Sequence, residues 1–209
     1  SKRDRRRLCV SCDDGASEPL GARYRNARLS IGACIGRAFR TRPAQMNAKP
    51  DPKHYRPNVG LALFHHDGPV FLGKRYGTEG PYQWQMPQGG VDRGESAAEA
   101  AYRELEEEIG VKPQHAELLE ETADWLYYEF PTDVRKKLSS RGRYKGQRQK
   151  WFAFRFKGRD SDIRLDAHTP EFSDWRWAPL ESAPELVIPF KRPIYEEIAL
   201  RFAKYSAGE

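Results

Sequence analysis

The positions of hydrophobic and polar residues along the chain predict several short strands and two helices. Residues 59–64 and 70–74 are apolar segments separated by the polar turn Asp67-Gly68-Pro69, and this arrangement predicts a β-hairpin. Further segments have the apolar or alternating pattern typical of strands: 84–88, 117–130, 150–156 and 175–177. Apolar residues at helical spacing predict a C-terminal helix over residues 194–205.

The clearest helical pattern lies near the middle of the chain. Ser96 stands where an N-cap is expected, Glu99 follows three residues later in capping-box position, and Gly110 is placed as a C-terminal glycine. Between them an apolar stripe recurs at helical spacing: Ala98, Ala101, Tyr102, Leu105 and Ile109. We therefore predict a helix between Ser96 and Gly110, preceded by a glycine-rich polar loop over residues 89–94.

The order of these elements indicates the fold class. Strands that bracket two helices favour one α/β domain, with helices on both faces of a mixed β-sheet. The basic, glycine-punctuated segment 135–148 separates two predicted strands, and we expect it to form a loop.

The central helix ends in a run of glutamates. Glu104, Glu107 and Glu108 share one face, at the negative end of the helix dipole, where carboxylates are disfavoured. A divalent cation such as Mg²⁺ would turn that repulsion into binding. Glu106 points away from this face, and we expect it to be solvated. An acidic surface helix is the plain alternative, but it does not explain the glycine loop at a fixed offset before the acids.

The spacing of these residues resembles the Nudix box. The matching positions are Gly89, Glu95, Arg103, Glu104, Leu105, Glu107, Glu108, Gly110 and Val111. The resemblance covers residues 54–205 and implies an α/β/α sandwich with a mixed sheet. It further implies a hydrolase in which Glu104, Glu107 and Glu108 are catalytic and bind Mg²⁺ or Mn²⁺ at a pyrophosphate. Gly89 would belong to the loop, and Glu95 and Arg103 would pair to hold that loop on the helix.

Segments outside the box are similar to the bacterial RNA pyrophosphohydrolase branch, which includes dinucleoside polyphosphate hydrolases. They are residues 55–60, 84–90, 146–152, 169–172 and 190–192. This likeness implies hydrolysis of the phosphoanhydride at triphosphorylated or diphosphorylated RNA 5′ ends, leaving 5′-monophosphate RNA and initiating decay. A diadenosine tetra- or pentaphosphate hydrolase is the nearest alternative. A non-catalytic module that binds RNA ends is another, although it would have no need of all three clustered glutamates.

The same likeness implies roles for single residues outside the box. Glu171 resembles an additional metal ligand, although it is alternatively an ordinary loop carboxylate. The remaining candidates would bind substrate: Arg56 and Arg75 the 5′ phosphates, Tyr128 the RNA end, Phe190 and Lys191 a base, and Gln149 and Lys150 as neighbours of the site. The two arginines are alternatively solvated surface residues, and Phe190 is alternatively a core aromatic. Segment 76–83 is longer than in enteric relatives and leaves the substrate preference open.

Charge divides the chain into two parts. The net charge of +6 belongs to residues 1–50, which hold 12 Lys and Arg against 4 Asp and Glu, whereas residues 51–209 have a slight acidic excess. We expect residues 1–50 to be a disordered basic extension. Its acid-free arginines faintly resemble a transit peptide, and Met46 as the natural start is the simpler interpretation.

The cysteines, histidines and apolar runs of the sequence indicate which compartment and which metal sites to expect. Cys9 and Cys12 have the spacing of half a zinc site or a redox pair, but no second pair or histidine accompanies them. The cysteine-free remainder fits a reducing cytoplasm. No apolar run approaches the ~18 residues that span a membrane. The histidines show no ligand spacing related to the box, and we expect them on the surface or in strands. No protein partner is identifiable.

Overall fold

The computed structural model describes residues 50–137 and 144–208. Its strands are β1 (Tyr55–Phe64), β2 (Val70–Arg75), β3 (Trp84–Gln85), β4 (Gln88–Gly90), β5 (Ala116–Glu121), β6 (Leu126–Glu129), β7 (Gly146–Phe156) and β8 (Phe172–Ala178). Its α-helices are α1 (Ala97–Ile109), α2 (Thr132–Lys137), α3 (Ala183–Leu186) and α4 (Arg192–Phe202), and a 3-10 turn η6 (Pro189–Lys191) precedes α4. The expected basic extension and its Cys9–Cys12 pair lie outside the described residues, apart from Pro50.

The strands form one mixed sheet whose centre is a parallel pair. Its main path runs β3-β2-β1-β7-β5, and β4, β6 and β8 pair with β1, β7 and β2 respectively. Strands β1 and β7 are parallel, with Arg56 opposite Gln147 and Asn58 opposite Gln149, and the other pairs are antiparallel. The parallel register brings polar side chains of both strands to the same end of the sheet.

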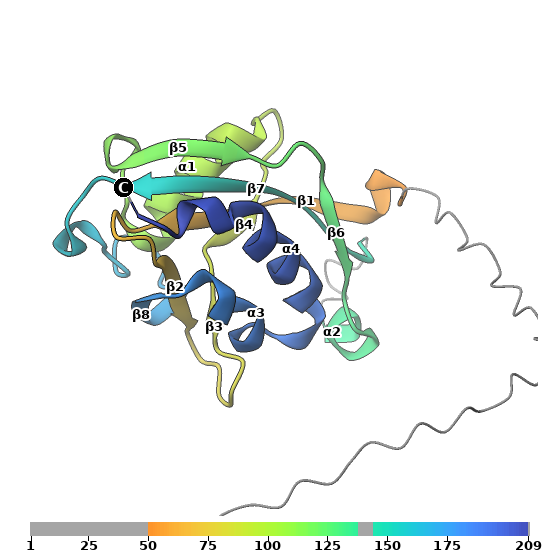
Figure 1. The fold of residues 1–209 in the computed structure, drawn as a ribbon. Helices are drawn as coiled ribbons and strands as arrows, with labels where there is room; N and C mark the ends of the chain where they lie inside the picture. The colour runs from red at the N-terminus through yellow and green to blue at the C-terminus, as the bar shows by residue number, and fades with distance from the viewer. Residues whose placement is uncertain (1–49, 138–143, 209) are drawn as a thin grey trace, which may run out of the picture. The chain divides into compact units, whose positions relative to one another are not determined.

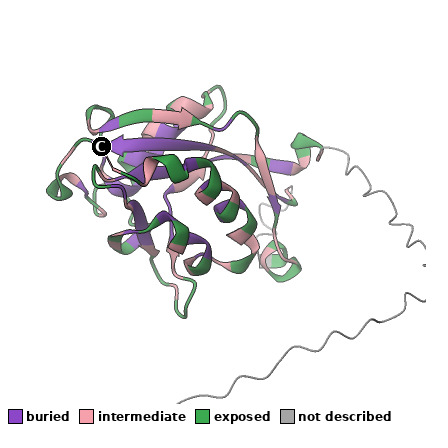
Figure 2. Cartoon of the chain, viewed as in Figure 1, coloured by how far each residue is buried: buried purple, intermediate pink, exposed green. Residues whose placement is uncertain are grey.

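Each face of the sheet has its own hydrophobic core. Leu105 and Ile109 of α1 pack with Leu61, Phe152 and neighbouring residues on one face. On the other face α3, α4 and η6 cover a core whose residues include Phe64, Val70, Trp151, Tyr195 and Phe202. Figure 1 shows α1 behind the strands and α4 in front of them, and Figure 2 shows the buried residues concentrated in the strands between. The predicted α/β fold, with a mixed sheet between helices, is confirmed.

Most predicted elements are present, but two strand predictions change. The hairpin forms from β1 and β2, and the central helix has both predicted caps. Segment 84–88 divides into β3 and β4, since Pro87 has no backbone N–H and its carbonyl instead accepts from Leu61 N. Segment 117–130 likewise divides into β5 and β6, because Thr122 turns inward and bonds to Trp151 through its backbone N–H and its hydroxyl.

Two predicted loops are partly wrong. Gly89 and Gly90 belong to β4, where they pair with Val59 and Asn58 of β1. Within segment 135–148, Arg135 lies on α2 and residues 146–148 begin β7. This polar segment therefore contains the end of a short helix and the start of a strand. Residues 138–143 of that segment lie outside the described part of the chain.

None of the helices in the described part of the chain combines the length and apolarity needed to cross a bilayer.

Candidate active site

Local signals at both ends of α1 fix where its glutamates point. The Ser96 hydroxyl accepts a hydrogen bond from Glu99 N at 3.2 Å, and the Glu99 carboxylate accepts one from Ser96 N at 2.8 Å. At the other end Gly110 adopts a φ of 70°, a left-handed conformation that favours glycine. Because both ends are fixed, the rotation of the acidic face about the helix axis is fixed as well.

The acidic face of α1 lines a cleft of about 290 Å³. Glu104, Glu107 and Glu108 form one wall, and the segment that leads into β8 contributes His168, Thr169 and Glu171. Glu104 and Glu108 are only 8% and 4% exposed, whereas Glu107 and Glu171 are open to solvent. Carboxylates from two distant parts of the sequence therefore face the same small cleft. Glu106 is exposed on the other side of the helix, as predicted.

Two glycines of β4 allow side chains to approach the backbone closely. A Cβ atom on Gly89 would stand 1.7 Å from the carboxyl carbon of Glu104. A Cβ on Gly90 would stand 2.3 Å from Nη2 of Arg56. The first position thus leaves space for a glutamate of the acidic cleft, and the second leaves space for a candidate substrate-binding arginine.

Arg103 joins the loop before α1 to the acidic face. Its guanidinium donates to both Glu95 oxygens at 2.8 and 2.9 Å, and to the Gly90 carbonyl at 2.7 Å. It also donates to Glu104 at 2.8 Å and Glu107 at 3.0 Å. All five N–H groups of an arginine are engaged by this set. Hydrogen bonding to Glu95 raises the pKa of Arg103 above its already high value, so its positive charge is permanent.

The buried carboxylates carry charges that the protein alone does not fully compensate. Burial raises the pKa of Glu108 well above its usual range, and the nearby Glu171 and Glu104 charges raise it further. The Glu108 carboxylate accepts one backbone hydrogen bond, from Gln88 N at 3.1 Å. Burial also raises the pKa of Glu104, and Arg103 opposes that rise.

This donor set fits a hard divalent cation. Mg²⁺ and Mn²⁺ prefer carboxylate oxygens. A cation among Glu104, Glu107, Glu108 and Glu171 would offset the burial of charge and the mutual repulsion that together raise the pKa values of Glu104 and Glu108. The exposed members of the set leave room for water or a phosphate oxygen to complete the coordination.

A second cavity, of about 340 Å³, is basic on one side and aromatic on the other. Its lining includes Arg56, Arg75, Gln88, Tyr128, Phe130, Arg135, Tyr144, Gln147, Phe190 and Lys191. Gln88 connects it to the acidic cleft, since the side chain lines this cavity while the backbone N–H binds Glu108. In the described part of the chain, the guanidinium groups of Arg56 and Arg75 have no hydrogen-bond or ion-pair partner, so both are available to an anion.

The aromatic side of this cavity is built from β6 and η6. The ring centroid of Phe190 lies 5.7 Å from that of Tyr128 and 6.4 Å from that of Phe130. The Tyr128 ring is buried, and its hydroxyl is bonded to Gln147 Oε1. Phe190 is half-buried, so it both packs against the core and presents part of its ring to the cavity.

Lys191 is a buried ammonium group at the junction of the two sites. It is 6% exposed, and its Nζ donates to Gln85 Oε1 at 3.3 Å. Burial lowers the pKa of Lys191 to about 7, Arg75 lowers it as well, and Glu108 and Glu171 act in the opposite direction. Near neutral pH its charge therefore responds to whatever occupies the acidic cleft.

Two further candidates do not reach either site. Gln149 is buried, and its amide donates to Asn58 Oδ1 at 2.6 Å and to Gln88 Oε1 at 3.2 Å, which places it behind Gln88. Lys150 points to the other face of β7, where Nζ donates to the carbonyls of Thr122 and Ala123 and pairs with Glu121. Neither residue lines the cleft or the cavity.

Sequence reasoning missed several residues that the fold adds to the site. Val134 and Arg135 of α2 and the neighbouring Tyr144 form the outer wall of the cavity, and no pattern placed them there. Phe130 and Gln147 could have been found from the strand alternation that points them the same way as Tyr128 and Gln149. His168 is exposed as predicted, yet it also lines the acidic cleft.

Comparison with known proteins identifies similar chains that are covered almost along their whole length. The family model described as NUDIX domain matches residues 54–198. An RNA pyrophosphohydrolase of Acidiphilium cryptum is 52% identical over 155 residues, covering 73% of this chain and 92% of that protein. Another, of Rhodospirillum rubrum, is 49% identical and covers 74% of this chain and 91% of that protein.

Solved structures show the same fold at low sequence identity. The Escherichia coli dihydroneopterin triphosphate pyrophosphohydrolase superposes with a TM-score of 0.53 at 22% identity, covering 71% of this chain and 99% of that one. A Caenorhabditis elegans Ap4A hydrolase binary complex gives 0.50 at 19% identity, with the same coverage. At these identities the likeness concerns the fold alone.

Proposed function

The chain belongs to the Nudix hydrolase family, and from this premise we propose that it hydrolyses the phosphoanhydride at the 5′ end of triphosphorylated or diphosphorylated RNA. Phosphate or pyrophosphate leaves, and the RNA keeps a 5′-monophosphate that opens it to decay. The reaction requires a divalent cation, as is typical of the family, and we propose Mg²⁺ with Mn²⁺ as a substitute. We expect the enzyme to act in the cytoplasm.

The observation that carries this proposal is the junction of two unlike sites through Gln88. The acidic cleft is suited to a cation, and the adjoining cavity offers Arg56 and Arg75 beside the rings of Tyr128 and Phe190. A nucleotide with a 5′ polyphosphate combines the matching chemistry, with phosphates next to a flat base. The similar proteins named RNA pyrophosphohydrolases support the choice of RNA.

The proposed residues divide the work between holding the cation and holding the substrate. Glu104, Glu107, Glu108 and Glu171 would hold the cation, which when bound neutralises phosphate charge and lowers the pKa of a water. Carboxylates of the same cleft can accept the proton that the attacking water loses.

On the substrate side, Arg56 and Arg75 would fix the phosphates through charge-assisted hydrogen bonds. Phe190 and Tyr128 would receive a base, whose stacking is worth about 1–3 kcal/mol and requires an unpaired nucleotide. The preferred substrate is therefore a single-stranded 5′ end.

Initial rates on two substrates test the proposal. The enzyme is given 5′-triphosphorylated RNA and diadenosine tetraphosphate with Mg²⁺, and we expect RNA to be hydrolysed with the higher kcat/KM. Turnover of the dinucleotide alone would assign the same machinery to the alternative substrate. Binding of RNA ends with no turnover of either compound would identify a binding module instead.

A labelled γ-phosphate on the RNA identifies the first product. Release of labelled pyrophosphate indicates a single cleavage between the α- and β-phosphates, whereas labelled orthophosphate indicates stepwise removal.

A further inference from the structure

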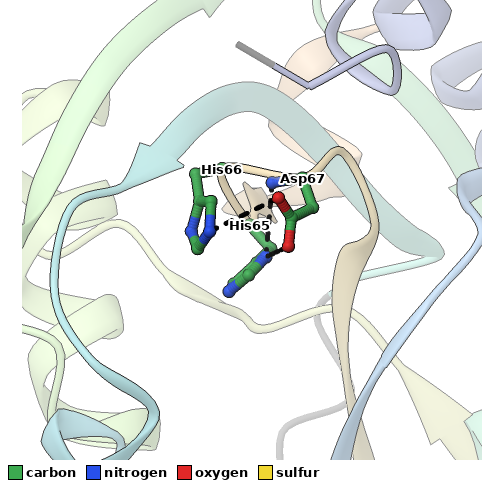
Figure 3. A group of neighbouring side chains, drawn as sticks. All are labelled: His65, His66 and Asp67. Atoms are coloured by element: carbon green, nitrogen blue, oxygen red, sulfur yellow. Dashed lines mark hydrogen bonds and ion pairs between the residues drawn. The ribbon is translucent and has the colours of Figure 1, made fainter.

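The turn between β1 and β2 brings two imidazoles and a carboxylate together, far from the acidic cleft. His65, His66 and Asp67 offer one ligand atom each, and these atoms all lie within 4.8 Å of one another. Figure 3 shows both histidine side chains directed toward Asp67. The carboxyl group of Glu104 lies against Gly89, which pairs with Val59 of β1. His65 is six residues further along the chain than Val59, which at ~3.3 Å per residue is about 20 Å. The cluster is therefore separate from the site of the proposed catalytic cation.

Backbone hydrogen bonds hold this turn in one conformation. His65 N donates to Pro69 O at 2.8 Å, and Gly68 N donates to His65 O at 2.9 Å. Gly68 has a φ of 108°, which an L side chain rarely adopts, and its Cα faces the Ser206 backbone so closely that a Cβ would stand 2.1 Å from Ser206 O. The positions of the three side chains thus follow from a closed turn packed against the C-terminal segment.

His65 is the best ordered of the three by its contacts. Its side chain is 18% exposed, and its ring packs 4.9 Å from that of Trp177 and 3.8 Å from that of His66. Its Nδ1 accepts a long hydrogen bond of 3.3 Å from Asp67 N, and Asp67 Oδ2 lies at the same distance from it. A metal ion would bind the same nitrogen through its lone pair.

Each histidine places one nitrogen near an oxygen of Asp67, at a distance close to the edge of a tetrahedral metal site. His65 Nδ1 lies 3.3 Å from Asp67 Oδ2, and His66 Nε2 lies 3.4 Å from Asp67 Oδ1. Both exceed the ~2.7–2.9 Å typical of a charge-assisted hydrogen bond. With zinc–ligand bonds of about 2.0–2.1 Å, the edge of a tetrahedron is roughly 3.3–3.4 Å. Each histidine is thus spaced from Asp67 as two ligands of one ion would be. All three donor atoms lie within 4.8 Å of one another, and rotation of the exposed His66 and Asp67 side chains would bring them onto a single ion.

From this geometry we propose that His65, His66 and Asp67 form a second metal site, selective for a borderline divalent transition ion such as Zn²⁺, Co²⁺ or Ni²⁺. Two imidazoles and one carboxylate suit these ions, whereas Mg²⁺ prefers oxygen ligands throughout. The fourth position is open to water. The ion replaces the long hydrogen bond at His65 Nδ1 and cross-links the side chains of the β1–β2 turn.

Equilibrium dialysis of Co²⁺ tests the proposal on the full chain without an affinity tag. Excess Mg²⁺ is present to occupy the acidic cleft, and Cys9, Cys12 and Cys34 are replaced by serine so that thiolates cannot bind the probe. We expect about one equivalent of Co²⁺, with the visible absorption of tetrahedral coordination. Since loss of a mere outer-shell partner costs ~10–100-fold in metal affinity, His65→Ala and His66→Ala should each weaken binding at least ~100-fold.

Matched variants separate this site from other sources of binding. His115→Ala removes a histidine that stands near one carboxylate but has no second imidazole beside it among the described residues, since its Nδ1 lies 4.0 Å from Asp162 Oδ2. This variant should leave Co²⁺ binding unchanged. Glu107→Gln should also leave it unchanged, since it alters only the acidic cleft. His66→Ala keeps the buried contacts of His65, so its folding can be verified by an unchanged melting temperature without metal. Absence of bound Co²⁺, or binding that persists in both the His65 and His66 variants, would overturn the proposal.

Discussion

Replacing Gly89 by alanine tests the geometry of the acidic cleft most directly. The added Cβ would stand 1.7 Å from the Glu104 carboxyl carbon and 1.9 and 2.0 Å from its two oxygens. Carbon atoms in contact are about 3.5 Å apart, so the carboxylate would have to retreat by roughly 2 Å. Gly89 lacks a left-handed φ, so the substitution introduces this contact without backbone strain.

The expected losses of stability and of activity follow from the contacts that hold Glu104 in place. Its carboxylate is bound by Arg103 Nη1 at 2.8 Å and is largely buried, so it cannot move without breaking that ion pair. Overpacking of this kind costs about 1–3 kcal/mol of stability, or roughly 2–4 °C of melting temperature per kcal/mol in a domain of this size. A 1 Å misplacement of a catalytic group costs on the order of 100-fold in rate, so a shift of about 2 Å should lower kcat/KM by at least that factor.

Gly90→Ala is the matched control in the next residue. Its Cβ would stand 2.3 Å from Arg56 Nη2, the far end of a flexible side chain that can swing aside. We expect the control to raise KM for triphosphorylated RNA while Mn²⁺ affinity is unchanged. Gly89→Ala should instead weaken Mn²⁺ binding, measured by calorimetry on both variants. Wild-type Mn²⁺ affinity in the Gly89 variant would show that Glu104 is not a ligand, and the cleft would need another interpretation.

The remaining predictions concern charges in and beside the cleft. Glu107→Gln and Glu108→Gln should each abolish nearly all turnover while circular dichroism stays unchanged, and near-native rates in both would remove the metal assignment. Because burial raises the pKa of Glu108, the metal-free protein should lose stability as pH rises from about 4.3, the unfolded value, through the raised folded value. A cation binds the deprotonated form, so Mg²⁺ should raise the melting temperature more at pH 8 than at pH 5, and an equal or opposite effect would contradict this. Lys191→Met removes a buried ammonium whose pKa is lowered to about 7, so it should stabilise the fold by about 1–2 kcal/mol, most clearly below pH 7, while slowing RNA hydrolysis. Phe190→Ala should raise KM for RNA roughly 10-fold or more with kcat little changed, measured by initial rates, whereas a fall in kcat alone would place the ring outside the binding step.

The sequence predicted what depends on local signals. The caps of α1, the spacing of Glu104, Glu107 and Glu108, and the β1–β2 hairpin all follow from side chains near one another in the chain. The convergence of Glu171 on the same cleft came from family resemblance, since 63 residues separate it from Glu108 and no period relates them.

The sequence could not predict features that arise only from packing between distant segments. The parallel pairing of β1 with β7 places Arg56 opposite Gln147, and nothing in either segment specifies that partner. The six residues of α2 are too few for a periodic pattern, so Arg135 was predicted to lie in a basic loop. Lys150 was predicted as a neighbour of the site, but it does not line the cleft or the cavity. Side chains alternate along a strand, so Lys150 points to the opposite face from Gln149 and donates to the Thr122 carbonyl.

The hydrogen bonds of Arg103 affect how the acidic cleft binds a cation. Glutamate side chains lose conformational entropy when they are ordered. If the carboxylates were mobile before the cation binds, this entropy loss would weaken cation binding. Here one permanently charged guanidinium already orders Glu104 and Glu107 during folding, so an incoming cation finds the carboxylates pre-arranged. A lysine, with three donors on a single nitrogen, could not span Glu95, Gly90 and both glutamates at once.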